Sequence, residues 1–194
     1  MRVILGSQSP RRQEILEYFT LPFVVAPSNF DERGLSYDGN VEAFVQISAQ
    51  QKGKALLKKF PDDVIITADT VVYFEGKILQ KPEDDTEAFE MLKALSGKTH
   101  EVVSGVAVRK GKQEESGVER TRVTFNAVGD REIHAYLKVS PGTDKAGAYG
   151  IQECGSLLVK GIEGSFYNVV GLPINLLYQK LKLFGIDLWD ALSS

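Results

Sequence analysis

Two arginines occupy a position in the sequence where helices usually carry acidic residues. The stretch SQSPRR begins at Ser7 and predicts a helix with Ser9 as N-cap and Pro10 as its first residue. A helix N-terminus carries partial positive charge, yet Arg11 and Arg12 follow. Solvated side chains would be a structural explanation for this pair. The functional explanation is an anion site, in which backbone N–H groups, the Ser7 and Ser9 hydroxyls and the two guanidiniums bind a phosphate.

A lysine lies on the apolar face of a long predicted helix, residues 40–59. Lys52 falls near the middle of that face, whereas Lys54 points away from it. The other residues on the face are Val41, Phe44, Val45, Ser48, Ala55 and Leu56. A lysine that extends from the helix end to solvent is the structural alternative. We favour a lysine directed into a cleft, where a phosphate would offset its loss of hydration.

Asp69 lies within the β-branched run VIITADTVVYF, where burying a carboxylate requires a cation, a metal or several donors. A capping or turn role is the alternative, although its neighbours indicate no turn. Glu32 lies beside Asp31 in a turn-rich loop, and such acids are usually solvated. If that loop faces Asp69, the two carboxylates could share Mg²⁺ or Mn²⁺. Lys81, followed by Pro82, adds a cation after the next strand.

Composition excludes several other classes of function. The chain has 194 residues, of which 43% are hydrophobic and 25% charged, as in a soluble globular domain. A net charge of −3 argues against a broad nucleic-acid surface. The sequence shows neither an apolar run of ~18 residues nor a signal peptide, so we expect a cytoplasmic protein without membrane contact. The single Cys154 excludes an internal disulfide, and as a nucleophile it would need a histidine that the sequence does not place beside it.

Alternating helices and strands must position these candidate residues. The sequence predicts helices at 10–19, 40–59, 84–96, 130–138 and 173–184, with Asp130 capping the fourth. It predicts strands at 2–5, 23–26, 64–75, 101–109 and 120–127, with a hairpin turn at Gly76-Lys77. A glycine-rich segment, 141–173, mixes turns with strand-like pieces. This order predicts an α/β fold in which helices cover the faces of a mixed sheet. The P-loop pattern and the GxGxxG pattern are both absent.

The motifs together resemble the Maf family of nucleoside triphosphate pyrophosphatases. They are SQSPRR, DE at 31–32, AQQK at 49–52, ADTVV at 68–72, QKP at 80–82, LSGKTHEVVSGVAV at 95–108, DKAGAYGIQ at 144–152 and NVVGLP at 168–173. The eight motifs stand in the family's order, and the likeness extends from Arg2 to about Leu183. The resemblance implies one Maf-like domain over residues 1–194, built on a long twisted mixed sheet. It also implies two lobes around a cleft and a likeness to the inosine triphosphate pyrophosphatases.

The resemblance also implies roles for individual residues. Asp69 matches the proton acceptor of the family. The residues that match its substrate-binding positions are Ser7, Arg11, Arg12, Glu32, Lys52 and Lys81. Asp69 and Glu32 are also the expected ligands of a divalent cation, Mg²⁺ or Mn²⁺.

The motif ending in YGIQ resembles the dTTP/UTP pyrophosphatase branch of the family. Arg12, Thr70 and Gln152 match its specificity positions, and the Gln152 amide could pair with the imide N–H and carbonyl of a pyrimidine. The chain departs from the family pattern at Gly53, in VSPGTDKAG and in ECGSLLVKGIEG after Gln152. The last departure adjoins the predicted base pocket.

The expected function is therefore hydrolysis of dTTP and UTP, or of modified pyrimidine nucleotides, to the monophosphate and pyrophosphate. The alternatives are a 7-methyl-GTP pyrophosphatase and a nucleotide-binding regulator of cell division with little catalysis. The expected partner is the nucleotide substrate, without nucleic acid or membrane. A homodimer is compatible with the sequence.

Overall fold

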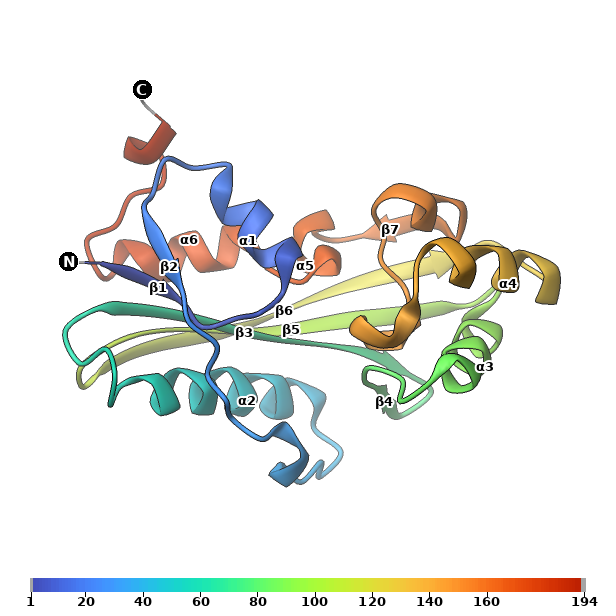
Figure 1. The fold of residues 1–194 in the computed structure, drawn as a ribbon, viewed down its shortest axis with the longest axis horizontal. Coiled ribbons are helices and arrows are strands. Elements are labelled where there is room, and N and C mark those ends of the chain that lie inside the picture. Colours follow the sequence, from blue (N-terminus) through green and yellow to red (C-terminus); the bar gives the residue numbers. More distant parts are fainter. Residues whose placement is uncertain (1, 193–194) are drawn as a thin grey trace. The chain divides into compact units, whose positions relative to one another are not determined.

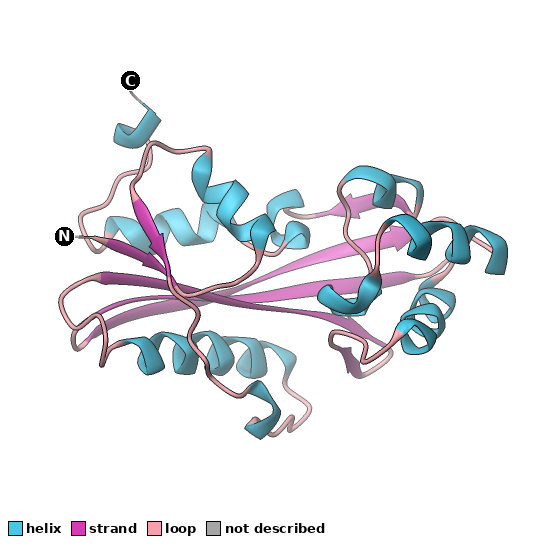
Figure 2. Ribbon diagram, in the orientation of Figure 1, coloured by secondary structure: helices cyan, strands magenta, loops and turns pink. Residues whose placement is uncertain are grey.

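The fold is a mixed α/β arrangement built on one seven-stranded sheet, as the sequence predicts (Figures 1 and 2). The computed structural model describes residues 2–192. The strands are β1 (Val3–Leu5), β2 (Phe23–Val25), β3 (Val64–Phe74), β4 (Lys77–Leu79), β5 (Thr99–Lys110), β6 (Gln113–Phe125) and β7 (Val159–Glu163). Their order is β2-β1-β3-β5-β6-β7, with β4 paired to β3. The sheet is mixed because β1 runs parallel to β2 and β3, whereas β4 and β7 are antiparallel to their neighbours.

Helices and short 3₁₀ turns connect these strands. The helices are α1 (Pro10–Glu17), α2 (Val41–Leu56), α3 (Asp85–Leu95), α4 (Asp130–Val139), α5 (Phe166–Val170) and α6 (Ile174–Lys182). The 3₁₀ turns are η1 (Glu32–Gly34), η2 (Gly142–Asp144), η3 (Ala146–Ala148), η4 (Glu153–Leu157) and η5 (Asp190–Leu192). No helix in the described part of the chain is long and apolar enough to cross a membrane.

Contacts divide the chain into two compact units, in agreement with the predicted two lobes. The first unit contains the chain up to Asp69, Ser104–Glu119 and the segment from Gly171 onward. The second unit contains Thr70–Val103 and Arg120–Val170. Strands β3, β5 and β6 contribute residues to both units.

In the first unit, α2 covers one face of the strands, and α1 and α6 cover the other (Figure 1). One of its hydrophobic clusters consists of Ile4, Ala26, Leu56, Phe60 and Ile65. Helix α2 approaches β5 so closely that a Cβ added to Gly105 would lie 2.3 Å from the Val45 carbonyl oxygen. Glycine at this position therefore permits the packing of α2 on the sheet.

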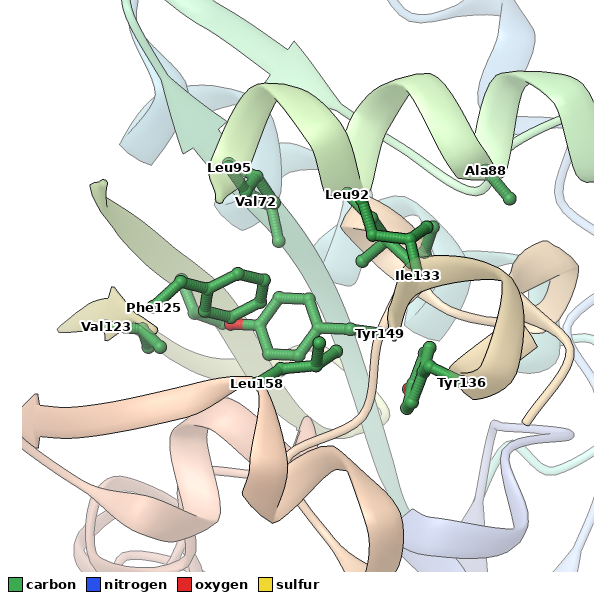
Figure 3. Close-up of a cluster of buried hydrophobic side chains, with 12 residues drawn as sticks. Val72, Ala88, Leu92, Leu95, Val123, Phe125, Ile133, Tyr136, Tyr149 and Leu158 are labelled. Atoms are coloured by element: carbon green, nitrogen blue, oxygen red, sulfur yellow. The ribbon is translucent and has the colours of Figure 1, made fainter. Parts of the chain in front are cut away.

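The second unit has a core centred on the Tyr149 ring (Figure 3). Its buried members are Val72, Ala88, Leu92, Leu95, Val102, Val123, Phe125, Ile133, Tyr136, Ala148, Tyr149 and Leu158. Ala88, Leu92 and Leu95, which share one face of α3, are all fully buried here. Burial of one face of α3 and α4 against this core explains why their sequences read as amphipathic.

Several predicted boundaries are wrong by a residue or more. The two-residue hairpin loop is Glu75-Gly76, since Phe74 pairs with Lys77, and both loop residues have positive φ as a type I′ turn requires. The N-cap of α4 is Gly129, whose N–H donates to the Glu132 carboxylate at 3.0 Å, rather than Asp130.

Strand β6 differs more from its predicted range, because it begins at Gln113 instead of Arg120. The polar side chains of this extra portion are half-buried against α2. Gln46 donates to Ser116 at 2.8 Å, and Gln50 donates to Glu114 at 2.9 Å. A strand whose inward side chains form hydrogen bonds with a helix lacks the apolar alternation on which the prediction depended.

Candidate active site

The centre of the candidate site is the ammonium group of Lys52, which lies between two carboxylates. Its Nζ is 2.8 Å from Asp69 Oδ1 and 2.8 Å from Glu32 Oε1. The Lys52 and Asp69 side chains are almost fully buried, whereas the Glu32 side chain is 48% exposed. Burial of both ions is favourable only because they are paired. The structure thus brings together three residues that the sequence placed in a loop, a helix and a strand.

Local structure explains how Lys52 and Asp69 reach this position. Helix α2 is capped by Asn40, the first residue of the predicted range, whose side chain accepts a hydrogen bond from Ala43 N–H. From that start Lys52 falls on the buried face, and Lys54 is exposed as expected. Ala55, which the sequence placed on the buried face, is exposed instead, because the buried face passes through Ala49, Lys52, Gly53 and Leu56. Asp69 lies on β3, whose residues from Val64 to Asp69 are all buried.

The start of α1 is stabilised by a different serine from the one expected. Ser9 is the N-cap residue, but its side chain makes no capping hydrogen bond. The hydroxyl oxygen of Ser7 accepts a hydrogen bond from Ser9 N–H at 3.1 Å. It accepts a second one from Arg12 Nη1 at 3.3 Å. Ser7 is buried, so this hydroxyl fixes the loop between β1 and α1.

Arg12 binds the backbone of its own unit. Its Nε donates to the Gly171 carbonyl at 2.7 Å, and its Nη1 donates to the Ala68 carbonyl at 2.8 Å. Loss of hydration lowers the pKa of Arg12, and the nearby carboxylates of Asp69 and Glu32 oppose that shift. Arg12 therefore links the start of α1 to the residue that precedes Asp69.

Arg11 is half-buried at the same helix start. Its charge contributes to lowering the pKa of Arg12, which places the two guanidiniums within each other's field. In the first unit the three candidate cations, Arg11, Arg12 and Lys52, outnumber the two carboxylates by one. Such a cluster suits a ligand that brings several negative charges.

The remaining three candidates belong to the second unit. Thr70 follows Asp69 on β3 and is half-buried. Lys81 is exposed and follows β4 by two residues, next to the buried Pro82. Gln152 is half-buried and precedes η4. The chemistry that the resemblance assigns to these three residues remains a prediction.

Sequence reasoning missed two groups that hold the site. The carbonyls of Ala68 and Gly171 receive the Arg12 guanidinium, and a backbone carbonyl leaves no mark in a sequence. The available signal was the glycine in NVVGLP, which has a φ of 118°. Residues with this backbone conformation are nearly always glycine.

Among the described residues of the site, the carboxylates of Asp69 and Glu32 are the oxygen donors that would suit a hard cation. Within residues 2–192, no group of three or more His, Cys, Asp or Glu side chains is placed to hold a metal ion. Asp69 and Glu32 approach the same point from two elements, since both lie 2.8 Å from one nitrogen. Mg²⁺ commonly takes one or two protein carboxylates and completes its shell with phosphate oxygens and water.

The fold is a mixed-sheet α/β fold, and its candidate site combines the buried, ion-paired Lys52 with the arginines at the start of α1. This combination is suited to bind a small polyanion. A family model described as Maf-like protein matches residues 2–184. The chain belongs to the Maf family.

Individual relatives are similar to this chain over nearly its whole length. A protein of Chlamydia caviae named dTTP/UTP pyrophosphatase is 44% identical over 192 residues, covering 98% of each chain. Another dTTP/UTP pyrophosphatase, from Acholeplasma laidlawii, is 44% identical over 184 residues, covering 95% of this chain and 97% of that one. A solved structure of a nucleoside-triphosphatase, dITP/XTP pyrophosphatase, from Mycobacterium abscessus is similar with a TM-score of 0.44. Its identity is 11%, over 95% of this chain and 98% of that one.

Proposed function

We propose that this chain is a nucleoside triphosphate pyrophosphatase that hydrolyses dTTP and UTP, or modified forms of them, to the monophosphate and pyrophosphate. The names of the two relatives described above support this substrate class. The structural observation that carries the proposal is the Lys52 ammonium held between Glu32 and Asp69, beside the basic start of α1. Burying these charges is costly even when they are paired, which favours a role for them beyond packing.

In the proposed reaction, a water oxygen attacks phosphorus and the bond between the α and β phosphates breaks. Asp69 accepts the proton of the attacking water. Its Oδ1 is engaged by Lys52, and none of the described residues donates to Oδ2. Oδ2 is therefore the oxygen assigned to the proton. Lys52 keeps the carboxylate oriented while this occurs.

The cations of the chain have a separate role. Arg11, Lys52 and Lys81 bind the triphosphate and stabilise the charge that develops on the leaving pyrophosphate. Ser7 and Arg12 fix the backbone of the helix start, where N–H groups can bind phosphate oxygens. A triphosphate carries about four negative charges at neutral pH, more than the net charge of these side chains can balance.

A divalent cation would supply the missing positive charge and screen the phosphates when bound. The residues present fit such an ion in their chemistry, because the Asp69 and Glu32 carboxylates are hard oxygen donors held side by side by the Lys52 ammonium. Mg²⁺ and Mn²⁺ are the ions that this donor set favours. Lys52 lies between the same two carboxylates and so holds both of them in place before nucleotide binds.

Base preference is assigned to Arg12, Thr70 and Gln152. The Gln152 side chain offers one acceptor and two donor hydrogens, which match the carbonyl and imide N–H of uracil or thymine. A site that pairs these groups rejects a base that leaves them unpaired. The methyl group that distinguishes thymine from uracil gives little discrimination.

The test is a panel of nucleotides assayed for pyrophosphate release, with and without Mg²⁺ or Mn²⁺. We expect kcat/KM to be highest for dTTP and UTP, and turnover to require the metal. Preference for 7-methyl-GTP would overturn the assignment of Gln152. Tight nucleotide binding without metal-dependent turnover would indicate a regulator instead of an enzyme.

Replacing Arg12 with lysine should change nucleotide preference as well as affinity. A lysine ammonium cannot reproduce the two hydrogen bonds that the planar Arg12 guanidinium donates to the Gly171 and Ala68 carbonyls. The start of α1 would therefore move relative to Asp69. We expect the ratio of kcat/KM for dTTP over 7-methyl-GTP to fall by about tenfold. Arg11→Lys is the matched control, which we expect to weaken all nucleotides alike. An equal loss for every nucleotide in Arg12→Lys would contradict the specificity role.

A further inference from the structure

The loop from Ala146 to Gln152 is largely buried in the second unit, although its one element of secondary structure is the short 3₁₀ turn η3. Ala148 is fully buried, and Tyr149 and Ile151 are 6% and 8% exposed. Its backbone is strained at Ala148, which has a φ of 63°, whereas the preceding Gly147 adopts a φ of 65° without strain. A non-glycine residue in this conformation persists only where its surroundings hold it there. The contacts of this loop therefore determine where it lies.

The Tyr149 side chain is the main anchor of the loop. Its hydroxyl forms a hydrogen bond with His100 Nε2 at 2.7 Å. The Tyr149 ring packs edge-to-face on Phe125 and on His100, with centroid distances of 4.7 and 5.4 Å. Burial lowers the pKa of His100 to about 4 and raises the pKa of Tyr149, so both are uncharged at neutral pH. The pair is a buried neutral hydrogen bond, which loses a partner if either group is removed.

Two further hydrogen bonds connect the loop to its neighbours. Gly147 N–H donates to the Gln80 carbonyl at 3.0 Å, and Gln80 directly precedes Lys81. Gly150 N–H donates to the Tyr136 hydroxyl at 3.1 Å.

Packing ties the same loop to β3. A Cβ added to Gly147 would lie 2.7 Å from the Val72 side chain, two residues beyond Thr70. The loop that ends in Gln152 is thereby connected to the segments that carry Thr70 and Lys81. Of the three candidate residues in the second unit, Gln152 lies on this loop, and Thr70 and Lys81 lie on segments that the loop contacts.

We propose that Tyr149, hydrogen-bonded to His100, is a positioning residue that sets nucleotide preference by fixing the loop that carries Gln152. This inference rests on the proposed function. Tyr149 belongs to the core, so it acts through the backbone of the loop rather than by touching the base. An amide displaced by a fraction of an ångström no longer meets both the carbonyl and the imide N–H of a pyrimidine. Loss of the anchor therefore affects pyrimidines more than bases that Gln152 does not pair.

The experiment compares Tyr149→Phe with the wild-type chain on dTTP, UTP, GTP and 7-methyl-GTP. We expect kcat/KM for dTTP and UTP to fall by about tenfold, mainly through KM, with little change for the purines. This is smaller than the ~10²-fold loss that a 1 Å misplacement can cause. Tyr178→Phe is the matched control, because it removes a tyrosine hydroxyl that bonds Asp187 at 3.1 Å in the first unit. It should leave the preference unchanged.

Two further measurements separate positioning from general stability. His100→Phe should lower the pyrimidine preference as much as Tyr149→Phe does, and the double variant should lower it no further. Hydrogen exchange of the peptide covering 146–152 should be faster in Tyr149→Phe and unchanged in Tyr178→Phe.

The outcomes that overturn the inference are distinct from failure of the proposed function. An unchanged preference in Tyr149→Phe overturns it, as does an equal loss for all four nucleotides, which would mark a purely structural role. Additive effects of the two substitutions would exclude action through one hydrogen bond. Failure of the proposed function would be seen in the wild-type chain itself, which would then show no preference for pyrimidines.

Discussion

Asp69→Asn should lower kcat for dTTP by about 1,000-fold while the chain remains folded. Asparagine has nearly the shape of aspartate, but its amide cannot accept the proton of the attacking water. General-base catalysis is typically worth 10²–10⁴-fold, and the same change also removes one carboxylate from the cation site. Lys52 keeps Glu32 as a partner 2.8 Å away, so its charge is not left unpaired. The loss should therefore be seen in turnover much more than in stability.

The measurement is pyrophosphate release under saturating nucleotide, together with the thermal midpoint of unfolding. Asp63→Asn provides a matched control. Asp63 is a similarly buried aspartate of the same unit, and its carboxylate accepts hydrogen bonds from Arg2 instead of Lys52. Asp63→Asn should keep normal turnover. A kcat within tenfold of wild type in Asp69→Asn would refute the role of Asp69 as proton acceptor.

Lys52→Met should abolish turnover and also lower the free energy of unfolding by about 3 kcal/mol. The methionine retains the apolar stem on α2, but the Asp69 carboxylate loses its counter-charge while its side chain is only 9% exposed. Removing one partner of a buried ion pair typically costs 3–5 kcal/mol. We take the lower end of the range because Glu32, the other carboxylate, is half exposed and can be solvated.

Denaturant unfolding of single and double variants tests this account. Lys54→Met, an exposed position two residues along the same helix, should leave both stability and turnover unchanged. The double variant Lys52→Met/Asp69→Asn should recover most of the lost stability and none of the activity, since no carboxylate is then buried without a partner. If Lys52→Met has the same free energy of unfolding as the wild type, the buried Asp69 carboxylate is not stabilised by its ion pair with Lys52.

Energetic reasoning on single residues predicted the centre of the candidate site. Asp69 lies in a β-branched strand and Lys52 on an apolar helix face, and each requires an opposite charge nearby to be buried. The structure pairs them directly. Glu32 could not be assigned in the same way, because an acid in a turn-rich loop is indistinguishable from a solvated one until the loop is placed. Its contact with Lys52 depends on tertiary structure alone.

The sequence predicted the ranges of helices and strands well wherever one face of the helix or strand is apolar and the opposite face is polar. Strand β3 is buried on both faces along its first half and was predicted from its run of β-branched residues instead. Helices α2 and α3 satisfy the condition, and their predicted ranges nearly match. The first half of β6 does not, because its inward side chains are polar and bond Gln46 and Gln50. The prediction for Arg12 was also incomplete. The sequence suggested that Arg12 binds phosphate, whereas in the structure its guanidinium donates to two backbone carbonyls.

The Ser7 hydroxyl has a defined direction within its hydrogen bonds. A serine oxygen has two lone pairs, and here Ser9 N–H and Arg12 Nη1 occupy both. What Ser7 can still offer is its own hydrogen, which bonds to none of the described residues. Arg12 polarises that O–H by donating to the same oxygen. The Ser7 hydroxyl can therefore act towards a ligand only as a hydrogen-bond donor. It can donate to an unprotonated phosphate oxygen, but it cannot accept a hydrogen bond from a hydroxyl or an amine.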